Sequence, residues 1–356
     1  CLSCLACMST CPSGVNYMHL VDHARSYIEN NYKRPLSERI TRRLLALVLP
    51  FPDRLRFALR LANLARPLAP VLARLQSMKP MAAMLTLAPR KVPGKTRALS
   101  KPHSQARGRV AIMRGCVEPV LRPEFQLAAA RVLSQLDFEV VGAPDEGCCG
   151  ALVHHMGRER DAHAAARRNV DAWATLIENG GLDAIIITAS GCGTTVKEYG
   201  FMLRDDPDYH EKAEQISKLA VDISEFLALH ELPEAKQRGI KVAYHSACSL
   251  QHGQQVTDAP VRLLAAAGYD VRTPAESHLC CGSAGTYNVL QPDIAAQLGD
   301  RKTQHLSLLD VDVIATGNIG CATQIAARSA TPVVHTIELL DWATGGPAPS
   351  AMQHQD

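Results

Sequence analysis

An internal duplication of cysteines limits what this chain can fold into more than any other feature of its 356 residues. Each of two segments contains a single cysteine, then an adjacent Cys-Cys-Gly, then another single cysteine. The first three cysteines of the two sets are separated by 132 residues, and the fourth by 129. Such a fixed offset indicates that the second half of the chain repeats the fold of the first half. The two sets are Cys116, Cys148, Cys149 and Cys192, and Cys248, Cys280, Cys281 and Cys321.

Short apolar runs alternate with helical patterns inside each repeat. Short strands that alternate with longer helices are typical of parallel sheets covered by helices. The chain is therefore expected to have an α/β fold, with two duplicated cysteine-rich domains whose sheets are largely parallel. The expected strands are residues 110–113, 139–141 and 184–188, and the expected helices are residues 123–136, 158–178, 261–267 and 294–306.

The positions of four cysteines relative to these strands indicate a site in each domain. Cys116, Cys192, Cys248 and Cys321 each come just after an expected strand. In parallel sheets, functional groups collect in the loops at the carboxyl ends of the strands. We therefore expect each set to gather at one end of its sheet. The expected segments are residues 1–35, 36–108, 109–236 and 237–346, with a tail at 347–356.

The first residues carry a separate motif, Cys1-x-x-Cys4-x-x-Cys7-x-x-x-Cys11-Pro12. This is the bacterial ferredoxin spacing, in which three close thiolates ligate one 4Fe-4S cluster and the fourth ligates the other cluster of a two-cluster module. Zinc is the alternative, but tetrahedral zinc sites usually use two separated cysteine pairs. Residues 1–35 are thus expected to be the second half of such a module. We expect two clusters in the full-length module and another cysteine run before Cys1.

Each repeat offers four thiolates, which are enough for one cluster or one metal ion. Adjacent cysteines suit a cluster because they can reach different irons, and Gly150 and Gly282 are expected to let the backbone approach a bulky inorganic group. Zinc and buried thiols without metal are the alternatives. Nearby histidines could complete a site or be ordinary polar residues. These histidines are His154, His155, His245, His252 and His278.

Charge separates one further segment. Residues 36–108 contain 15 Lys or Arg and 2 acidic residues, although the net charge of the whole chain is only +3. Prolines predict several short amphipathic helices here, ending in a basic linker at 89–107. Arg and Leu mix at helical spacing, which favours contact with anionic lipid or an acidic subunit. A solvated basic face is the alternative, and the 4% aromatic content argues against nucleic acid.

The cysteine usage and the apolar runs indicate the compartment. Twelve clustered cysteines in a chain of this length favour metal binding in a reducing compartment over disulfides. The apolar runs are far shorter than the ~18 residues of a membrane-spanning helix. We expect a cytoplasmic protein, peripheral on the inner face of the bacterial cytoplasmic membrane.

Four stretches carry a resemblance to known families: residues 7–15 (CMSTCPSGV), 188–200 (TASGCGTTVKEYG), 277–287 (SHLCCGSAGTY) and 318–321 (NIGC). The repeats resemble the cysteine-rich domain of heterodisulfide reductases, and the whole chain resembles the iron–sulfur subunits of glycolate oxidases. The resemblance implies an electron-transfer subunit without a catalytic residue of its own. It implies FAD-containing flavoprotein partners that oxidise glycolate to glyoxylate, and a quinone or another carrier as electron acceptor.

The chain departs from the heterodisulfide reductase pattern at one position in each repeat. That domain ends in Cys-x-x-Cys, and five cysteines hold a non-cubane cluster, whereas Thr195 and Gln324 occupy the last position here. The departure argues against a non-cubane cluster and against direct disulfide reduction. The alternatives are the equivalent subunit of a glycerol-3-phosphate or lactate dehydrogenase, a thiol/disulfide enzyme, and a zinc-containing scaffold. No P-loop is present, and no Gly-x-Gly-x-x-Gly follows a strand, so no nucleotide site is expected.

Overall fold

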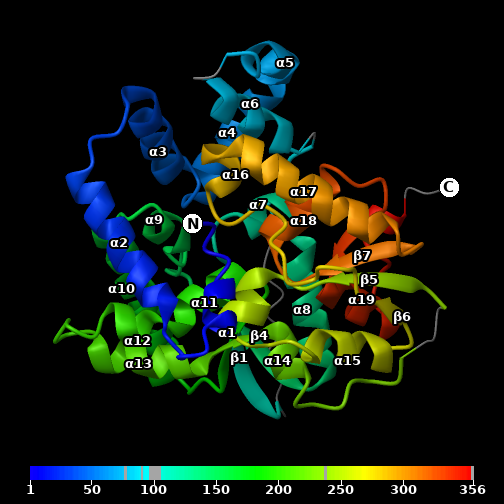
Figure 1. Ribbon diagram of the computed structural model, residues 1–356. Helices are drawn as coiled ribbons and strands as arrows, with labels where there is room; N and C mark the ends of the chain where they lie inside the picture. Colours follow the sequence, from blue (N-terminus) through cyan, green and yellow to red (C-terminus); the bar gives the residue numbers. More distant parts are fainter. Residues whose placement is uncertain (76–77, 90, 96–105, 236–238, 354–356) are drawn as a thin grey trace.

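The computed structural model describes residues 1–75, 78–89, 91–95, 106–235 and 239–353 and has the expected α/β architecture. Two repeats, each built on one parallel sheet, pack against each other (Figure 1). Helices α2 and α3 run along the left-hand edge of this view, and helices α4, α5 and α6 lie at the top. The N-terminal segments therefore lie over the repeats rather than apart from them.

Both sheets are entirely parallel and have equivalent strand orders, β2-β1-β3-β4 and β6-β5-β7-β8. The first strand of each repeat lies inside its sheet, and its central residues are completely buried. Continuous apolar runs are what a parallel strand covered on both faces requires. The strands are β1 (Gly108–Ile112), β2 (Phe138–Val141), β3 (Ala184–Ile187), β4 (Ala220–Asp222), β5 (Lys241–His245), β6 (Asp270–Arg272), β7 (Val313–Thr316) and β8 (Val333–His335).

Helices follow the strands in both repeats. In the first repeat they are α7 (Glu118–Leu121), α8 (Glu124–Gln135), α9 (Ala151–His155), α10 (Glu159–Glu178), α11 (Ser190–Lys197), α12 (Tyr199–Met202), α13 (His210–Leu219) and α14 (Ile223–Leu227). In the second they are the π-helical turn η3 (Ser249–Gly253), α15 (Ala259–Ala266), α16 (Tyr287–Leu290), α17 (Pro292–Ser307), α18 (Ile319–Ala326), α19 (Thr336–Ala343) and the 3₁₀ turn η4 (Ser350–Met352).

The expected strands and helices are all found, and each boundary differs by at most two residues. The sequence did not indicate β4 and β8, which form one edge of each sheet. Each of these strands has only three residues, too few for a recognisable apolar pattern.

One apolar core joins the two repeats. Helix α8 packs against α19, and α14 packs against α15, so each repeat contributes an equivalent pair of helices. Polar contacts reinforce this interface: Arg131 Nε lies 3.1 Å from Asp341 Oδ1, and His335 Nε2 donates to the Thr188 carbonyl oxygen at 2.8 Å. The repeats therefore pack on one shared core, and the loops after their strands can share one site.

The segment before the repeats is helical, as predicted. Pro52, Pro70 and Pro80 lie in the first turns of α4, α5 and α6, where the missing N–H costs no helical hydrogen bond. The expected linker at 89–107 falls largely outside the described residues. The helices are α1 (Ala6–Thr10), α2 (Tyr17–Asn31), α3 (Leu36–Val48), α4 (Pro52–Ala65), the 3₁₀ turn η1 (Arg66–Leu68), α5 (Ala69–Leu72) and α6 (Lys79–Leu87).

One arginine of this segment is structural. Arg56 is buried on α4, and its two Nη atoms donate to the carbonyl oxygens of Pro93 and Pro119 at 2.5 and 2.6 Å. The bond to Pro119 ties α4 to α7, the short helix that follows Cys116. Among the described helices, none combines the length and the apolar character needed to cross a bilayer.

Candidate metal centre

In the first repeat, the strand ends and the Cys-Cys-Gly turn bring four thiols together. Cys116 follows β1, and Cys192 lies in the first turn of α11, just after β3. Hydrogen bonds link Cys116 to Cys148, Cys148 to Cys149, and Cys149 to Cys192. The four cysteines expected from the sequence are therefore assembled at one place, and all are unbonded thiols.

The thiols of this first set are electrostatically unequal. Cys148 interacts with the thiols of Cys116 and Cys149, and these hydrogen bonds hold its pKa well below the usual value. The hydrogen bond to Cys148 and burial raise the pKa of Cys116, and the hydrogen bonds to Cys148 and Cys192 raise that of Cys149. Without a metal, this buried group of sulfurs favours ionisation of only one thiol. Four thiolates can coexist there only when bound cations balance their negative charge. The donor set thus suits zinc or iron.

The second repeat assembles its set in the same way. Hydrogen bonds link Cys248 to Cys280, Cys280 to Cys281, and Cys281 to Cys321. All four side chains are buried. Cys321 lies in the first turn of α18, as Cys192 does in α11, and helix N-termini favour thiolates. The duplicated sequence pattern therefore corresponds to duplicated geometry.

The glycine of each Cys-Cys-Gly turn has a packing role that the sequence did not indicate. Gly150 and Gly282 have φ angles of +86° and +87°, a left-handed conformation that glycine adopts without strain. A Cβ atom at Gly150 would lie 3.1 Å from the carbonyl oxygen of Ala162 on α10, and one at Gly282 would overlap that of Ala295 on α17. The glycines thus let the turn pack against a helix, and the expected approach of the backbone to an inorganic group stays a prediction.

A buried cation accompanies the second set. Lys302 on α17 is 2% exposed, and its Nζ donates to the carbonyl oxygens of Glu276 and Ser277 at 2.7 and 3.4 Å. Desolvation lowers the pKa of Lys302, and the neighbouring cysteines oppose that shift. An ammonium group near thiols favours their ionised form. The sequence analysis missed Lys302, although a lysine on the inner face of an amphipathic helix is a usable signal.

Histidines take two kinds of place in the structure. His154 contacts Asp22 (Nε2 to Oδ2, 3.1 Å), and His252 contacts Ser9 (Nδ1 to Oγ, 2.8 Å), so both hold the N-terminal segment. His155 lies beside Arg25, and burial lowers its pKa to about 4. His278 contributes its carbonyl oxygen to His252.

His245 differs from these histidines because it lies among cysteines. It ends β5, three residues before Cys248, and one ring nitrogen lies with the Cys281 and Cys321 sulfurs so that all three atoms are within 4.8 Å of one another. Burial lowers the pKa of His245 to about 3, so the imidazole is neutral.

The cysteine-bearing loops of the two repeats meet. Ser190 Oγ lies 2.7 Å from Ser249 Oγ, and Thr194 Oγ1 donates to the Ser249 carbonyl oxygen at 2.9 Å. These contacts join α11, which carries Cys192, to the turn after Cys248. A cavity of about 730 Å³ opens beside this junction, and all eight cysteines of the two repeats line it.

Aliphatic side chains form the other walls of this cavity. They come from α3, α4 and α6, a contribution that the sequence analysis missed because it depends on how these helices pack on the repeats. Binding sites for small organic molecules combine mostly apolar walls with a few polar groups, and this size is typical of them. The helices supply, among others, Leu45, Val48, Leu59, Ala62, Met84 and Leu85.

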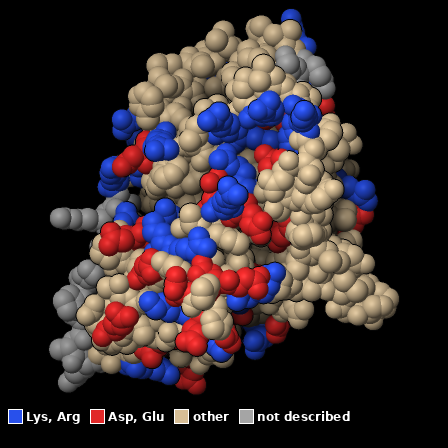
Figure 2. All heavy atoms as spheres, turned by 90° about the vertical axis from the view of Figure 1, so that its left-hand side faces the viewer, with Lys and Arg blue, Asp and Glu red and all other residues tan. Residues whose placement is uncertain are grey.

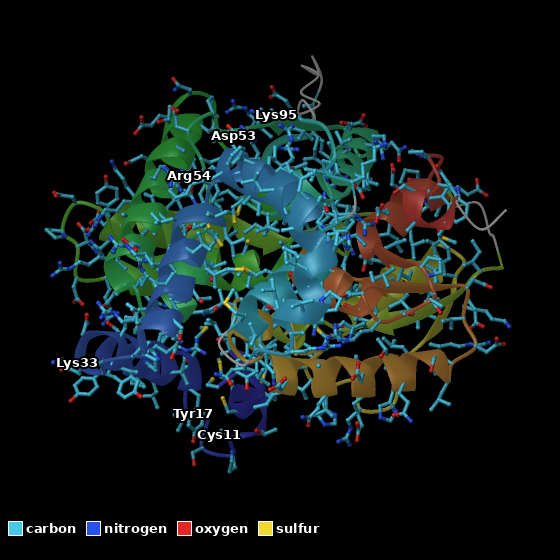
Figure 3. All side chains as sticks on the ribbon, turned by 90° about the horizontal axis from the view of Figure 1, so that it is seen from above. Cys11, Tyr17, Lys33, Asp53, Arg54 and Lys95 are labelled. Atoms are coloured by element: carbon cyan, nitrogen blue, oxygen red, sulfur yellow. The ribbon has the colours of Figure 1, made fainter. Side chains whose placement is uncertain are left out.

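The ferredoxin-type cysteines surround the short helix α1. Cys1 and Cys7 are exposed, and Cys4 and Cys11 are half-buried. Backbone N–H groups of Val15 and Ser13 lower the pKa of Cys11, which also contacts Tyr17. Figure 3 shows Cys11 beside Tyr17 at the edge of the molecule, with sulfur atoms continuing towards its centre. Cys4 lines the same cavity as the eight repeat cysteines.

The N-terminal segment is docked on both repeats. Helix α1 packs on η3 of the second repeat, and α2 packs on α9 of the first. His19 Nε2 contacts Glu198 Oε2 at 2.8 Å, and the His19 ring stacks on Phe201 with 3.5 Å between centroids. These contacts hold the ferredoxin-type cysteines close to the two four-cysteine sets.

The positions that lack a fifth cysteine have other partners. Thr195 Oγ1 donates to the Gly191 carbonyl oxygen at 3.3 Å. Gln324 is buried, and its Nε2 donates to the Ala295 carbonyl oxygen at 3.2 Å. Both side chains therefore stabilise the fold around the sets, and neither offers a thiol.

Comparisons with known proteins agree with this description. The cysteine-rich domain family (CCG) matches residues 110–197 and 242–326. The Escherichia coli "Glycolate oxidase iron-sulfur subunit" is 41% identical over 96% of this chain and 81% of its own length. The Bacillus subtilis "Probable glycolate oxidase iron-sulfur subunit" is 29% identical over 91% of this chain and 76% of its own length. A Bacillus licheniformis "Lactate utilization protein A" is 25% identical over 65% of this chain and 99% of its own length.

A solved structure supports the fold alone. The crystal structure of a hypothetical protein from Helicobacter pylori aligns with a TM-score of 0.51 and 12% identity, over 78% of this chain and 59% of that protein. Fold and site thus define a protein of two CCG repeats joined to a ferredoxin-type cysteine motif. The chain belongs to the family of glycolate oxidase iron–sulfur subunits.

Proposed function

We propose that this chain transfers electrons within a glycolate oxidase. The electrons come from a flavoprotein subunit, which oxidises glycolate to glyoxylate, and they pass through this chain to a quinone. One observation carries the proposal: Cys4 of the ferredoxin-type motif lines the same cavity as the eight cysteines of the repeats. Cysteines that served only as core residues would not need to line a common cavity. Their grouping around one space is what a chain of closely spaced redox centres requires.

The candidate ligands fit iron–sulfur centres. We assign Cys1, Cys4, Cys7 and Cys11 to 4Fe-4S clusters and the two buried four-cysteine sets to further metal centres. Such clusters, when bound, accept and release electrons, at potentials set by burial and by hydrogen bonds to sulfur. The N–H groups of Val15 and Ser13 next to Cys11 and the ammonium group of Lys302 are this chain's contributions to such tuning.

The proposed reaction balances. Oxidation of glycolate to glyoxylate releases two electrons and two protons, which a flavin takes up. Reduction of a quinone to a quinol consumes two electrons and two protons. The apolar cavity next to the repeat cysteines supports a quinone as the acceptor, because the flat, largely apolar ring of a quinone would find aliphatic walls there.

The same helices support contact with a membrane. Twelve of the 21 large apolar side chains exposed in the described structure lie between residues 36 and 81. They include Phe57 and Leu64 on α4, which are 63% and 81% exposed. In Figure 2, Lys and Arg side chains gather over the upper part of the face, around broad uncharged areas. Exposed apolar residues bordered by cations match an anionic bilayer, the compartment in which quinones dissolve.

Replacing exposed apolar residues of α4 is expected to release the protein from membranes. Burying a Phe or Leu side chain is worth about 1.5–3 kcal/mol, so the variant Phe57→Asp/Leu64→Asp should bind anionic vesicles about 100-fold more weakly. Flotation with phosphatidylglycerol vesicles measures this. The matched control is Leu229→Asp/Leu308→Asp, at equally exposed leucines of the repeats. If both variants float like the wild type, α4 is not the surface that contacts lipid, and loss of flavoprotein binding in the α4 variant would instead make α4 a subunit interface.

The test of electron transfer itself is whether glycolate reduces iron–sulfur centres of this chain in the intact complex. A chain without clusters, or one whose clusters stay oxidised during turnover, would contradict the proposal.

A further inference from the structure

His245 is a buried imidazole with no hydrogen-bond partner. Its side chain is 0% exposed, and neither ring nitrogen has a partner among the described residues. Leaving a buried polar group unpaired costs about 1–3 kcal/mol. His335 is equally buried, but its Nε2 donates to the Thr188 carbonyl oxygen at 2.8 Å and its Nδ1 accepts from the Ile337 N–H at 3.1 Å. The unpaired nitrogens of His245 therefore need another explanation.

The surroundings of His245 supply that explanation. A ring nitrogen, Cys281 Sγ and Cys321 Sγ lie within 4.8 Å of one another, the only such group of three found in the described part of the chain. A tetrahedral metal with bonds of about 2.0–2.3 Å places its ligand atoms about 3.3–3.8 Å apart. The three atoms thus need only a small adjustment to bind one ion. Cys248 and Cys280 continue the same hydrogen-bonded group and can supply the remaining ligand.

The first repeat has nothing equivalent. The residue 132 positions before His245 is Met113 at the end of the first β-run, so the imidazole is replaced by a thioether. Lys302 also differs. Because Gly150 faces Ala162 and Gly282 faces Ala295 in the same way, the residue equivalent to Lys302 is Asn169. Each set has one cation beside it, Arg168 at Cys148 in the first repeat and Lys302 in the second. The feature that the second repeat adds is therefore the nitrogen donor of His245.

We propose that the two repeats hold different metal centres, and that His245 is a ligand in the second, together with Cys281, Cys321 and a further cysteine of that set. The first repeat uses thiolates alone. The metal in the second repeat is zinc or one iron of a cluster, and in both cases it is coordinated by one nitrogen and several sulfurs. A neutral imidazole in place of a thiolate makes a centre less negative, and histidine ligation raises the potential of an iron–sulfur cluster. The proposal for His245 rests on the proposed function only where it takes the ferredoxin-type centres to be iron–sulfur clusters.

The test compares the wild type with His245→Met in the full-length protein within its complex, prepared without oxygen. Methionine is the residue that the first repeat accommodates at this place, so the variant is expected to fold. Zinc and iron X-ray absorption and pulsed EPR of the reduced protein are the readouts. In the wild type we expect one imidazole on zinc, or a strong ¹⁴N coupling on a reduced cluster, and these two results identify the metal. In His245→Met we expect the nitrogen signature to vanish and metal affinity in the second repeat to fall more than about 100-fold.

Two controls make the outcome decisive. His335→Gln removes an equally buried histidine that has partners, and it should leave every metal signal unchanged. Unchanged metal content and unchanged spectra in His245→Met would overturn the proposal. The signals of the ferredoxin-type clusters and their reduction by glycolate are followed in the same samples. Loss of those signals in the wild type would contradict the proposed function without bearing on His245.

Discussion

Replacing Cys7 by alanine is expected to abolish electron delivery by the complex. Cys7 lies on α1 in the ferredoxin-type motif, and an alanine there would remove one of the three close thiolates that we assign to one 4Fe-4S cluster. Removing even an outer partner of a metal ligand costs about 10–100-fold in affinity or activity, so we expect a fall of more than 100-fold for the ligand itself. Quinone reduction driven by glycolate is the measurement. Reduction of the flavin by glycolate should continue, because the proposed function places that site on another subunit.

Thr10→Ala is the matched control for this variant. Thr10 is exposed on the same helix, and its Oγ1 only donates to the carbonyl oxygen of Ala6. The control should retain its clusters and its quinone reductase rate. If Cys7→Ala kept both as well, Cys7 would not be a ligand, and the ferredoxin interpretation of the first eleven residues would be wrong.

Filling the cavity is expected to block the acceptor selectively. Ala62 on α4 lines the cavity, and a tryptophan there would occupy part of its volume of about 730 Å³. We expect glycolate-dependent reduction of a short-chain quinone to fall at least about tenfold, which corresponds to about 1.4 kcal/mol. Reduction of a water-soluble dye, which takes electrons from exposed centres, should change little. The two rates measured on one preparation separate a blocked acceptor site from a damaged cluster.

Leu64→Trp controls for the added tryptophan. Leu64 is on the same helix but is 81% exposed, and it does not line the cavity. Its substitution should leave both rates unchanged. Equal loss of dye and quinone reduction in Ala62→Trp would indicate general damage, and full quinone activity would place the acceptor elsewhere.

Most of the fold could be predicted because the duplication repeats cysteines and Cys-Cys-Gly at a nearly constant offset. The 132-residue offset of the cysteines and the apolar runs before them indicated two parallel α/β repeats. The cysteine sets could be predicted for the same reason, since strand ends deliver Cys116 and Cys248 to the loops where parallel sheets gather functional groups. The edge strands β4 and β8 were missed because three residues are too few to show an apolar pattern.

The rest of the site depends on packing between distant segments. Neither the cavity between the repeats nor its walls from α3, α4 and α6 leave a local pattern in the sequence. His245 was one of five candidate histidines, and only the structure separates it from His154 and His252, which bind the N-terminal segment. The packing role of Gly282 was not predicted because the helix that crowds it, α17, begins ten residues further along the chain.

The most direct test of the central claim is freeze-quench EPR of the intact complex after anaerobic mixing with glycolate. The account predicts that reduced 4Fe-4S signals from this chain appear after flavin reduction and no more slowly than turnover, and that adding quinone removes them. Cys7→Ala should show reduced flavin without that signal. Turnover with quinone while every cluster of this chain stays oxidised would contradict the account.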